Sequence, residues 1–198
     1  MPEDWVKDLN ESNRAFLNLV WPVIASQCGG GKIKPVEVWR GNALANDLDV
    51  LCGIDIWQTI TGEGARGIAS RVQFGPVNYQ TFTIRLYRDT GAKTEYEKRL
   101  FAIESNGRFI YPYLTCQAYV TCKGVLLGVG VAKTVDIFDV IKQEKVLHRR
   151  SPNSGFMAIK WSDVKDCWVR NMDTQCAIVT NTQSAIVTKK LQQKVLFT

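Results

Sequence analysis

A carboxylate lies inside an otherwise apolar stretch of the chain, Ile54-Asp55-Ile56-Trp57. An ionised carboxylate is costly to bury unless it is paired with a cation or binds a metal. Farther along the chain, Arg71 and Gln73 interrupt a second apolar stretch. A carboxylate, a guanidinium and an amide carbonyl can together hold a hard cation or a phosphate group. We therefore take residues 48–73 as the best candidate for a functional site.

The second stretch predicts which way its polar side chains point. Side chains alternate between the two faces of a strand, so Ala69, Arg71 and Gln73 share one face and the residues between them share the other. The second face is mostly apolar and predicts contact with the core. Arg71 and Gln73 then point to the same site as Asp55. Two structural alternatives stay open, in which Asp55 pairs with Arg71 across the hairpin and Gln73 hydrogen-bonds the turn.

A β-hairpin is the element that must bring these residues together. Strands are predicted over residues 52–60 and 66–74, and the connection Thr61-Gly62-Glu63-Gly64 supplies the glycines that tight turns require. Residues 81–87 alternate in the same way and predict a third strand, antiparallel to the second. Residues 32–40 look extended. The stretches 109–120 and 124–132 predict two further strands.

Helices are predicted before and after the hairpin. Residues 3–28 have apolar side chains at helical spacing, and Gly29-Gly30-Gly31 ends this helix. Thr94 and Glu97 form a capping-box pattern at the start of a helix that continues to residue 104. Thr134 is expected to cap a third helix through residue 141. The mixed order of elements favours an α/β or α+β protein with one central sheet.

The order of these elements resembles the core of the PD-(D/E)XK, or restriction-endonuclease-like, nuclease superfamily. That family carries an Asp on one strand and a Glu or Gln, any residue, and a Lys on the next strand. Gly53-Ile54-Asp55 matches the first position, and the resemblance covers residues 3–141. The second position departs from the pattern, because the strand reads Ala69-x-Arg71 or Arg71-x-Gln73. The resemblance implies a mixed sheet flanked by helices.

The resemblance also implies a divalent metal, Mg²⁺ or Mn²⁺. Asp55 would be a metal ligand, Gln73 would ligate through its carbonyl oxygen, and Arg71 would replace the family's Lys in stabilising charge. A second carboxylate is needed because Mg²⁺ prefers anionic oxygens. Glu95 or Glu97 could supply it, and so could Glu37 or Asp49 from the N-terminal side. The alternative for the run of charges around Glu95 and Glu97 is a solvated helix face.

These residues predict metal-assisted hydrolysis of phosphodiester bonds in DNA, as by a metal-dependent endodeoxyribonuclease. The metal would polarise the phosphate and activate water, and Arg71 would stabilise charge in the transition state. The alternative is a module that has kept the fold, lost the metal site, and binds nucleic acid or a protein partner. Family members often act as dimers, so the resemblance also implies a homodimer.

The charge of the chain favours a polyanionic partner. The formal net charge is +6 and the isoelectric point is near 9.0. Four basic residues lie close together in residues 142–150 and form a candidate nucleic-acid-binding strip: Lys142, Lys145, Arg149 and Arg150. A solvated loop is the alternative interpretation of this strip.

Composition excludes several other classes. Apolar residues make up 45% and charged residues 22% of the 198, as in globular proteins. No apolar run reaches the roughly 20 residues that span a bilayer. The acidic start, Met-Pro-Glu-Asp-Trp, lacks the order of a secretory signal, so we expect a cytoplasmic protein. The six cysteines form no Cys-x-x-Cys pair and predict reduced thiols rather than a zinc site.

Two regions are predicted. Residues 1–150 would form the restriction-endonuclease-like core, and residues 151–198 a β-rich C-terminal extension packed on it. The extension contains a local echo, Thr-Gln-Cys-Ala-Ile-Val-Thr at 174–180 and Thr-Gln-Ser-Ala-Ile-Val-Thr at 182–188. Two copies are too few for a solenoid, and we expect them to pair as a hairpin.

Overall fold

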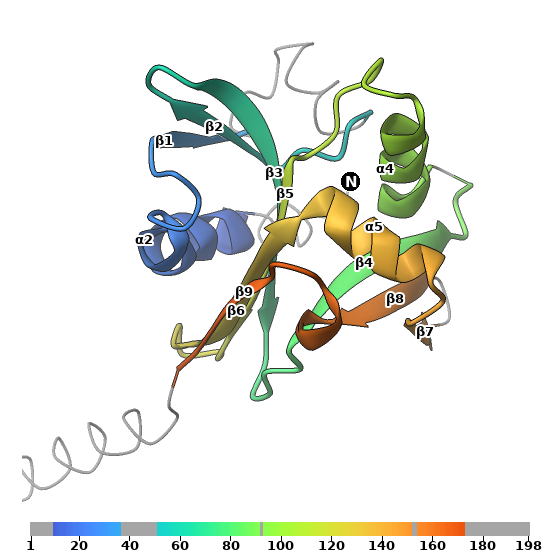
Figure 1. Ribbon diagram of the computed structural model, residues 1–198. Helices are drawn as coiled ribbons and strands as arrows, with labels where there is room; N and C mark the ends of the chain where they lie inside the picture. The colour runs from blue at the N-terminus through green and yellow to red at the C-terminus, as the bar shows by residue number, and fades with distance from the viewer. Residues whose placement is uncertain (1–9, 37–50, 92, 152–153, 173–198) are drawn as a thin grey trace, which may run out of the picture.

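A six-stranded sheet runs through the middle of the protein, and a smaller sheet lies to one side of it (Figure 1). The structure is a computed structural model and describes residues 10–36, 51–91, 93–151 and 154–172. Within these residues the protein is a mixed α/β structure, as the sequence predicts.

The six-stranded sheet contains the predicted hairpin. Its order is β1 (Lys32–Pro35), β2 (Ile56–Ile60), β3 (Gly64–Phe74), β5 (Leu114–Val120), β6 (Leu126–Lys133) and β9 (Trp168–Asn171). Neighbouring strands are antiparallel except for β3 and β5, which are parallel. A parallel pair needs a crossover connection. Residues 75–113, which include β4 and α4, make this crossover.

The expected third strand forms but joins a different sheet. β4 (Thr81–Arg88) pairs with β8 (Ser154–Lys160), which in turn pairs with β7 (Leu147–Ser151). The prediction that residues 81–87 lie antiparallel to the second strand of the hairpin is therefore wrong. The place beside β3 is taken by β5, whose seven residues are all buried. Burial of this apolar strand on both faces favours the centre of the sheet.

One face of the large sheet is covered by the N-terminal helix (Figure 1). Residues 10–24 are helical, as a π-helical segment η1 (Phe16–Val20) followed by α2 (Trp21–Ile24). Pro22 lies at the start of α2, where its missing N–H costs little. The helix buries Phe16, Val20 and Ile24 against Ile68 of β3 and apolar residues of β5 and β6.

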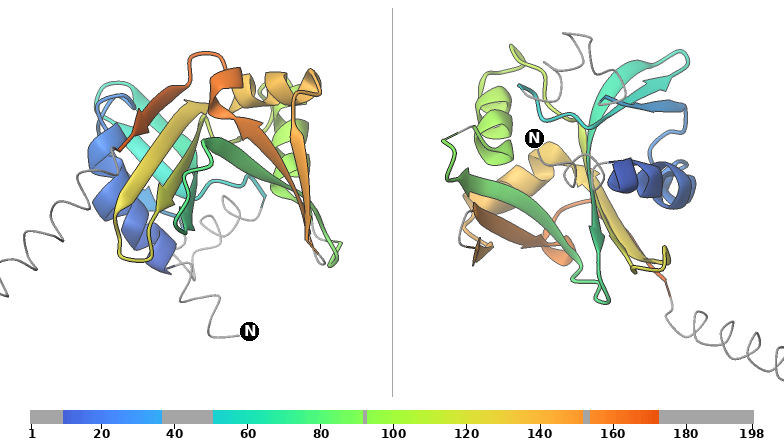
Figure 2. Two further views of the ribbon diagram at one scale, coloured as in Figure 1. Left: turned by 90° about the horizontal axis from the view of Figure 1, so that it is seen from below. Right: turned by 180° about the vertical axis from the view of Figure 1, so that it is seen from behind.

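The opposite face of the large sheet meets the small sheet and two helices, as the two views in Figure 2 show. These helices are α4 (Glu95–Glu104) and α5 (Thr134–Lys142), and a short 3-10 helix η3 (Trp161–Asp163) follows β8. The second core lies here, around Trp161, Phe82, Phe138 and Tyr119. The protein therefore buries apolar side chains on both faces of its central sheet.

Two local details differ from the sequence expectations. Asp55 does not lie inside a strand: β2 begins one residue later, at Ile56. Thr134 is the first residue of α5 rather than its cap, and Lys133 occupies the N-cap position without a side-chain hydrogen bond. The Thr134 hydroxyl is instead 2.9 Å from the Thr115 hydroxyl of β5. The capping box of α4 is confirmed, with Thr94 and Glu97 bonded reciprocally.

Residues after 150 contribute to both sheets. β8 is the middle strand of the small sheet, and β9 pairs with β6 at the edge of the large sheet. The described part of the C-terminal extension therefore shares its hydrogen-bonded ladders with residues before 150. The echo at 174–188 lies outside the described residues, as do residues 3–9 of the predicted N-terminal helix and 37–40 of the extended segment.

The described helices are all too short or too polar to cross a bilayer. Of the cysteines in the described residues, Cys28 and Cys116 are buried, and none is disulfide-bonded. Burial raises the pKa of the Cys28 thiol to about 11, against the opposing effect of Arg66. Such thiols stay protonated at neutral pH and are poor nucleophiles.

We predict that Gly130→Ala destabilises the protein. An added Cβ would lie 2.5 Å from the buried indole of Trp161, which fills the space between the two sheets. Overpacking of this kind costs about 1–3 kcal/mol of unfolding free energy. Urea denaturation measures the loss. The control is Gly75→Ala, where no atom lies within 4 Å of the added Cβ; an equal loss in both variants would contradict the packing argument.

Candidate functional site

Asp55 lies directly before β2, at the end of β2 where its pairing with β3 stops. Its backbone N–H donates to the Ile68 carbonyl at 3.1 Å, which holds it against the longer strand. β2 pairs with β3 only as far as Ile68. Two residues farther along β3, the Ser70 N–H donates to the Asp55 carboxylate at 2.7 Å. The carboxylate thus accepts a hydrogen bond from a strand amide that has passed the end of its partner strand.

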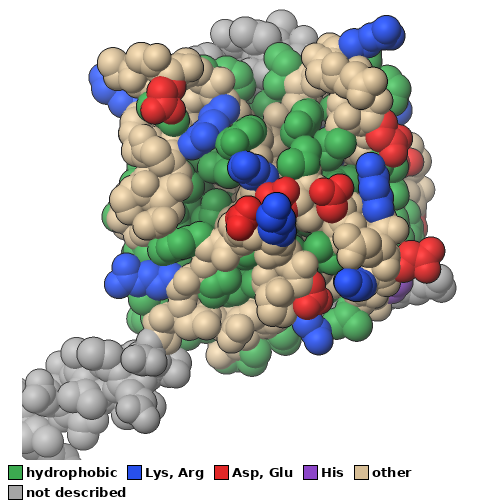
Figure 3. All heavy atoms as spheres, in the orientation of Figure 1, with side chains coloured by type: hydrophobic (Ala, Val, Ile, Leu, Met, Phe, Trp, Pro, Cys, Tyr) green, Lys and Arg blue, Asp and Glu red, His purple; other side chains and the backbone are tan. Residues whose placement is uncertain are grey.

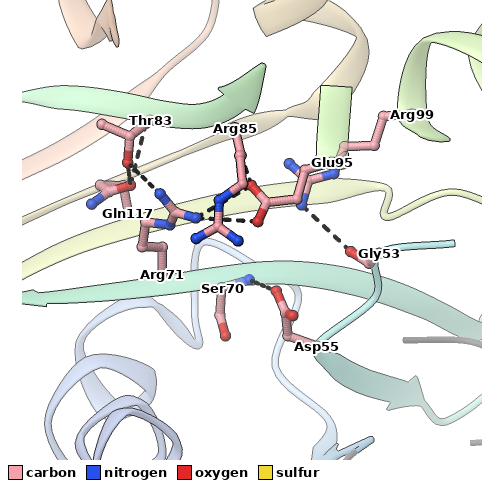
Figure 4. Close-up of polar contacts among 9 residues, drawn as sticks. All are labelled: Gly53, Asp55, Ser70, Arg71, Thr83, Arg85, Glu95, Arg99 and Gln117. Atoms are coloured by element: carbon pink, nitrogen blue, oxygen red, sulfur yellow. Dashed lines mark hydrogen bonds and ion pairs between the residues drawn. The ribbon is translucent and has the colours of Figure 1, made fainter. Parts of the chain in front are cut away.

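Arg71 is on the face of β3 that points away from the N-terminal helix, and its side chain joins β3 to α4. Its guanidinium forms an ion pair with Glu95, at 3.2 Å between Nη2 and Oε1 and 3.3 Å to Oε2. Both side chains are partly exposed, at 29% for Arg71 and 22% for Glu95. Arg71 therefore points away from the core face of β3 that carries Ile68, as predicted. The ion pair that the structure shows for it is with Glu95 rather than with Asp55, so the expected meeting of Arg71 with Asp55 is not seen (Figure 4).

Polar side chains of β4 and β5 complete the site. Arg71 Nη1 donates to the Thr83 hydroxyl at 3.2 Å. This hydroxyl in turn donates to the side-chain amide oxygen (Oε1) of the buried Gln117 at 3.0 Å. The Arg85 backbone N–H donates to Glu95 at 3.3 Å. Figure 4 shows these groups converging on the space between the two sheets. The Glu95 carboxylate therefore joins α4 to β3 and β4.

The charges around Glu95 set its protonation. Burial by itself would raise the pKa of this carboxyl. The positive charges of Arg71, Arg99 and Arg85, with the backbone hydrogen bond from Arg85, outweigh burial and lower the pKa to about 2. Glu95 is therefore ionised at any physiological pH. Its charge is shared among several guanidinium groups.

Arg99 is the buried cation of the site. It is 4% exposed and lies four residues after Glu95 on the same face of α4. Its Nη2 donates to the Gly53 carbonyl at 3.5 Å, next to the Asp55 segment. Burial lowers the pKa of Arg99, and the negative charges of Glu95 and Asp55 both raise it. Both carboxylates therefore act on one guanidinium, although they come from different elements.

Of the predicted residues, the structure joins Arg71 and Glu95 directly, and Asp55 lies two residues after Gly53, whose carbonyl accepts from Arg99 of the same helix as Glu95. Gln73 and Glu97 lie apart from them. Gln73 is three residues beyond Ser70 on β3, about 10 Å along the strand, so it does not lie beside Asp55. Glu97 is exposed, and its carboxylate accepts from the Thr94 N–H at 2.7 Å in the capping box, which lowers its pKa. Glu97 therefore serves the helix end.

The other predicted residues lie elsewhere. Glu37 and Asp49 fall outside the described residues. Lys142 ends α5, Lys145 is exposed in the turn that follows, and Arg149 and Arg150 belong to β7. β7 is separated from β4 by β8, so Arg149 and Arg150 belong to the edge strand of the small sheet that is farther from the site. On the face drawn in Figure 3, basic and acidic side chains are mixed rather than gathered into one basic patch.

Sequence reasoning missed Arg85, Arg99 and Gln117. Arg99 had a signal, because Glu95, Arg99 and Ala102 follow each other at i, i+4 and i+7, the spacing of a buried helix face. For Gln117 and Arg85 the sequence contains no signal that distinguishes them from other polar strand residues. Their role depends on the approach of β4 to β5, which joins residues distant in the chain.

The donors present fit a divalent metal in part. Mg²⁺ is commonly held by one or two carboxylates together with substrate phosphates and water, and Asp55 and Glu95 are two such groups. No cluster of three or more His, Cys, Asp or Glu side chains occurs among the described residues. A metal at this site would therefore rely on two carboxylates and on oxygens of its substrate.

Comparison with known proteins adds no family: no family model, curated protein or solved structure matches this chain.

We predict that Glu95 makes the protein sensitive to acid. A carboxyl whose pKa is lower in the folded state stabilises that state above its unfolded pKa, near 4.5, and loses this effect as the pH falls toward about 2. The shift corresponds to an unfolding free energy on the order of 3 kcal/mol. Denaturation curves at about pH 5 and pH 2.5 should show a smaller acid-induced loss for Glu95→Gln than for the natural protein.

The matched control for this measurement is Glu104→Gln, at the exposed C-terminal end of the same helix. It should keep the acid sensitivity of the natural protein. If Glu95→Gln loses as much stability on acidification as Glu104→Gln does, the arginines do not hold the Glu95 pKa low.

Proposed function

We propose that the protein is a Mg²⁺-dependent nuclease that hydrolyses phosphodiester bonds in DNA, at a site built from Asp55, Arg71 and Glu95. The observation that carries the proposal is the ion pair of the partly exposed Arg71 with Glu95, together with the hydrogen bond that Arg99 of the same helix donates to Gly53, two residues before Asp55. Carboxylates and a guanidinium are the groups that metal-assisted phosphoryl transfer uses.

The arrangement of elements supports a restriction-endonuclease-like fold for this nuclease. A helix precedes the hairpin, Asp55 stands directly before one of its strands, and Arg71 lies on the other. A helix that supplies a carboxylate follows, and then a strand parallel to β3. Ala69 stands near Asp55 at the place where the family pattern has Glu or Gln. Glu95 on α4 would replace this missing carboxylate.

Each residue then has a defined part in the reaction. Asp55 and Glu95 would hold the metal, which when bound supplies an activated water and polarises the phosphate. Arg71 is held by Thr83 and Glu95 on one face of β3. The Arg71 guanidinium would offset the negative charge that develops on the phosphate during the reaction.

A second candidate function is nucleic-acid binding without hydrolysis, or binding of a protein partner through the same face. The low pKa of Glu95, caused by Arg71 and Arg99, favours it, because a carboxylate that already neutralises cations attracts a metal less strongly. DNA is the partner of the nuclease and of the nucleic-acid-binding alternative, and the net charge of +6 supports a polyanion. Metal dependence of any cleavage separates the two functions.

We predict that Asp55→Asn abolishes Mg²⁺- or Mn²⁺-dependent nicking of supercoiled plasmid. An Asn carbonyl can still accept the Ser70 N–H, so the fold should persist, whereas the lost charge removes a metal ligand. The nicking rate should fall by about 100-fold or more. Agarose gels over a time course measure the rate, and thermal unfolding verifies the fold.

Asp163→Asn removes a charge from an exposed residue of η3 and should nick like the natural protein. Cleavage by Asp55→Asn at the natural rate would overturn the assignment of this residue. Absence of metal-dependent cleavage by the natural protein, with DNA binding retained in EDTA, would favour the second candidate.

A further inference from the structure

Arg85 lies in the site with its guanidinium free of hydrogen bonds to the described residues. Its backbone N–H is used by Glu95, but its buried Nε atom has no partner there. A guanidinium carries five N–H donors, and leaving buried donors unpaired is costly. Arg85 nevertheless remains partly exposed. The remaining N–H groups of Arg85 are therefore available to a ligand that enters the site.

Arg85 and Arg71 face the same aromatic ring. The guanidinium carbon of Arg85 is 5.2 Å from the centre of the Phe156 ring, and that of Arg71 is 5.4 Å from it. Arg85 of β4 and Phe156 of β8 are directly opposite each other in the antiparallel ladder, so the strand pairing itself places Arg85 beside the ring. The two cations come from different sheets, so the fold holds like charges next to each other.

A β-bulge follows Arg85 directly. The register of β4 with β8 shifts between Arg85 and Tyr87. An extra residue at a bulge bends the strand and re-aims the side chains beside it, and bulges are enriched next to functional sites. Thr83 and Arg85 lie on the face of β4 that meets Arg71 and Gln117.

The charges of the site do not balance among the described residues. Three guanidinium groups, of Arg71, Arg85 and Arg99, stand against the carboxylates of Glu95 and Asp55. Burial lowers the pKa of Arg85, and the positive charges of Arg88 and Arg71 lower it further, against the effect of Glu95. An added anion would relieve this repulsion.

We infer that Arg71 and Arg85 form a binding pair for a phosphate group, with Phe156 as its floor, and that the ligand is a phosphodiester of the nucleic-acid backbone. Guanidinium groups bind phosphate oxygens through paired, charge-assisted hydrogen bonds, which are stronger than neutral ones. The inference adds Arg85 to the proposed site and rests on nucleic acid being its substrate. It does not require hydrolysis, because phosphate binding by arginine needs no metal.

The test is DNA binding without metal. Fluorescence anisotropy with a fluorescein-labelled duplex in EDTA compares the natural protein with Arg85→Gln and with Arg170→Gln. Arg170 is exposed on β9, so both variants lose one positive charge but only one loses the pair. Arg85→Gln should weaken binding about tenfold and lower the slope of log affinity against log salt by about one. Equal effects of the two substitutions would overturn the inference.

A second measurement tests whether Arg85→Gln is correctly folded, and whether the pair binds inorganic phosphate or only the phosphodiester of DNA. Thermal unfolding is recorded in inorganic phosphate and in chloride at the same ionic strength. A stabilisation by phosphate that Arg85→Gln loses shows that free phosphate also occupies the pair. An effect on DNA alone supports the backbone diester. If Arg85→Gln unfolds at a lower temperature than the natural protein in chloride and its DNA affinity changes no more than that of Arg170→Gln, Arg85 is structural and the inference fails.

Because this assay omits metal, its outcome is independent of cleavage. Arg85-dependent binding without any nicking by the natural protein would refute hydrolysis and retain the phosphate pair. Nicking that depends on Asp55 but not on Arg85 would refute the pair and retain the nuclease.

Discussion

The ion pair between Arg71 and Glu95 is the interaction on which the arrangement of the site depends. Arg71 belongs to the central strand β3, and Glu95 begins the helix α4 that packs on the small sheet. Through Glu95, the same carboxylate also receives the backbone N–H of Arg85. The Glu95 carboxylate thus has polar contacts with the large sheet and the small sheet from its place on α4. Apolar burial on both sides of it supplies the stability that makes such a contact affordable.

The excess of arginine around Glu95 connects the two proposals. A site that only stabilised the fold would balance its charges, because unpaired buried cations oppose folding. Here Arg99 shares Glu95 with Arg71, and the buried Nε atom of Arg85 has no partner among the described residues. Under the proposed phosphate binding, a backbone phosphate would complete the set of charges. Hydrolysis would then depend on whether Glu95 can exchange its arginine partners for a metal.

The comparison of sequence with structure shows where pattern reasoning succeeds. The hairpin of β2 and β3 was predictable because alternation and turn glycines are local signals, and the α4 capping box needs only residues 94–97. The orientation of Arg71 followed from the same alternation. The sequence predicted that residues 81–87 form a strand, but it did not predict that this strand, β4, pairs with β8 in a second sheet. Propensity states that a segment is extended without stating which strand it pairs with.

The sequence by itself therefore determined the elements, the side of β3 on which Arg71 points, and the presence of Asp55 beside a second apolar strand. Only the tertiary structure decided that Glu95 rather than Glu97 meets Arg71, because the helix rotation that separates these two side chains is set by packing of α4. It also decided that Arg85 joins the site. This contact needs β4 to leave the large sheet and pair with a strand some seventy residues later in the chain, and no local pattern encodes such a long-range pairing.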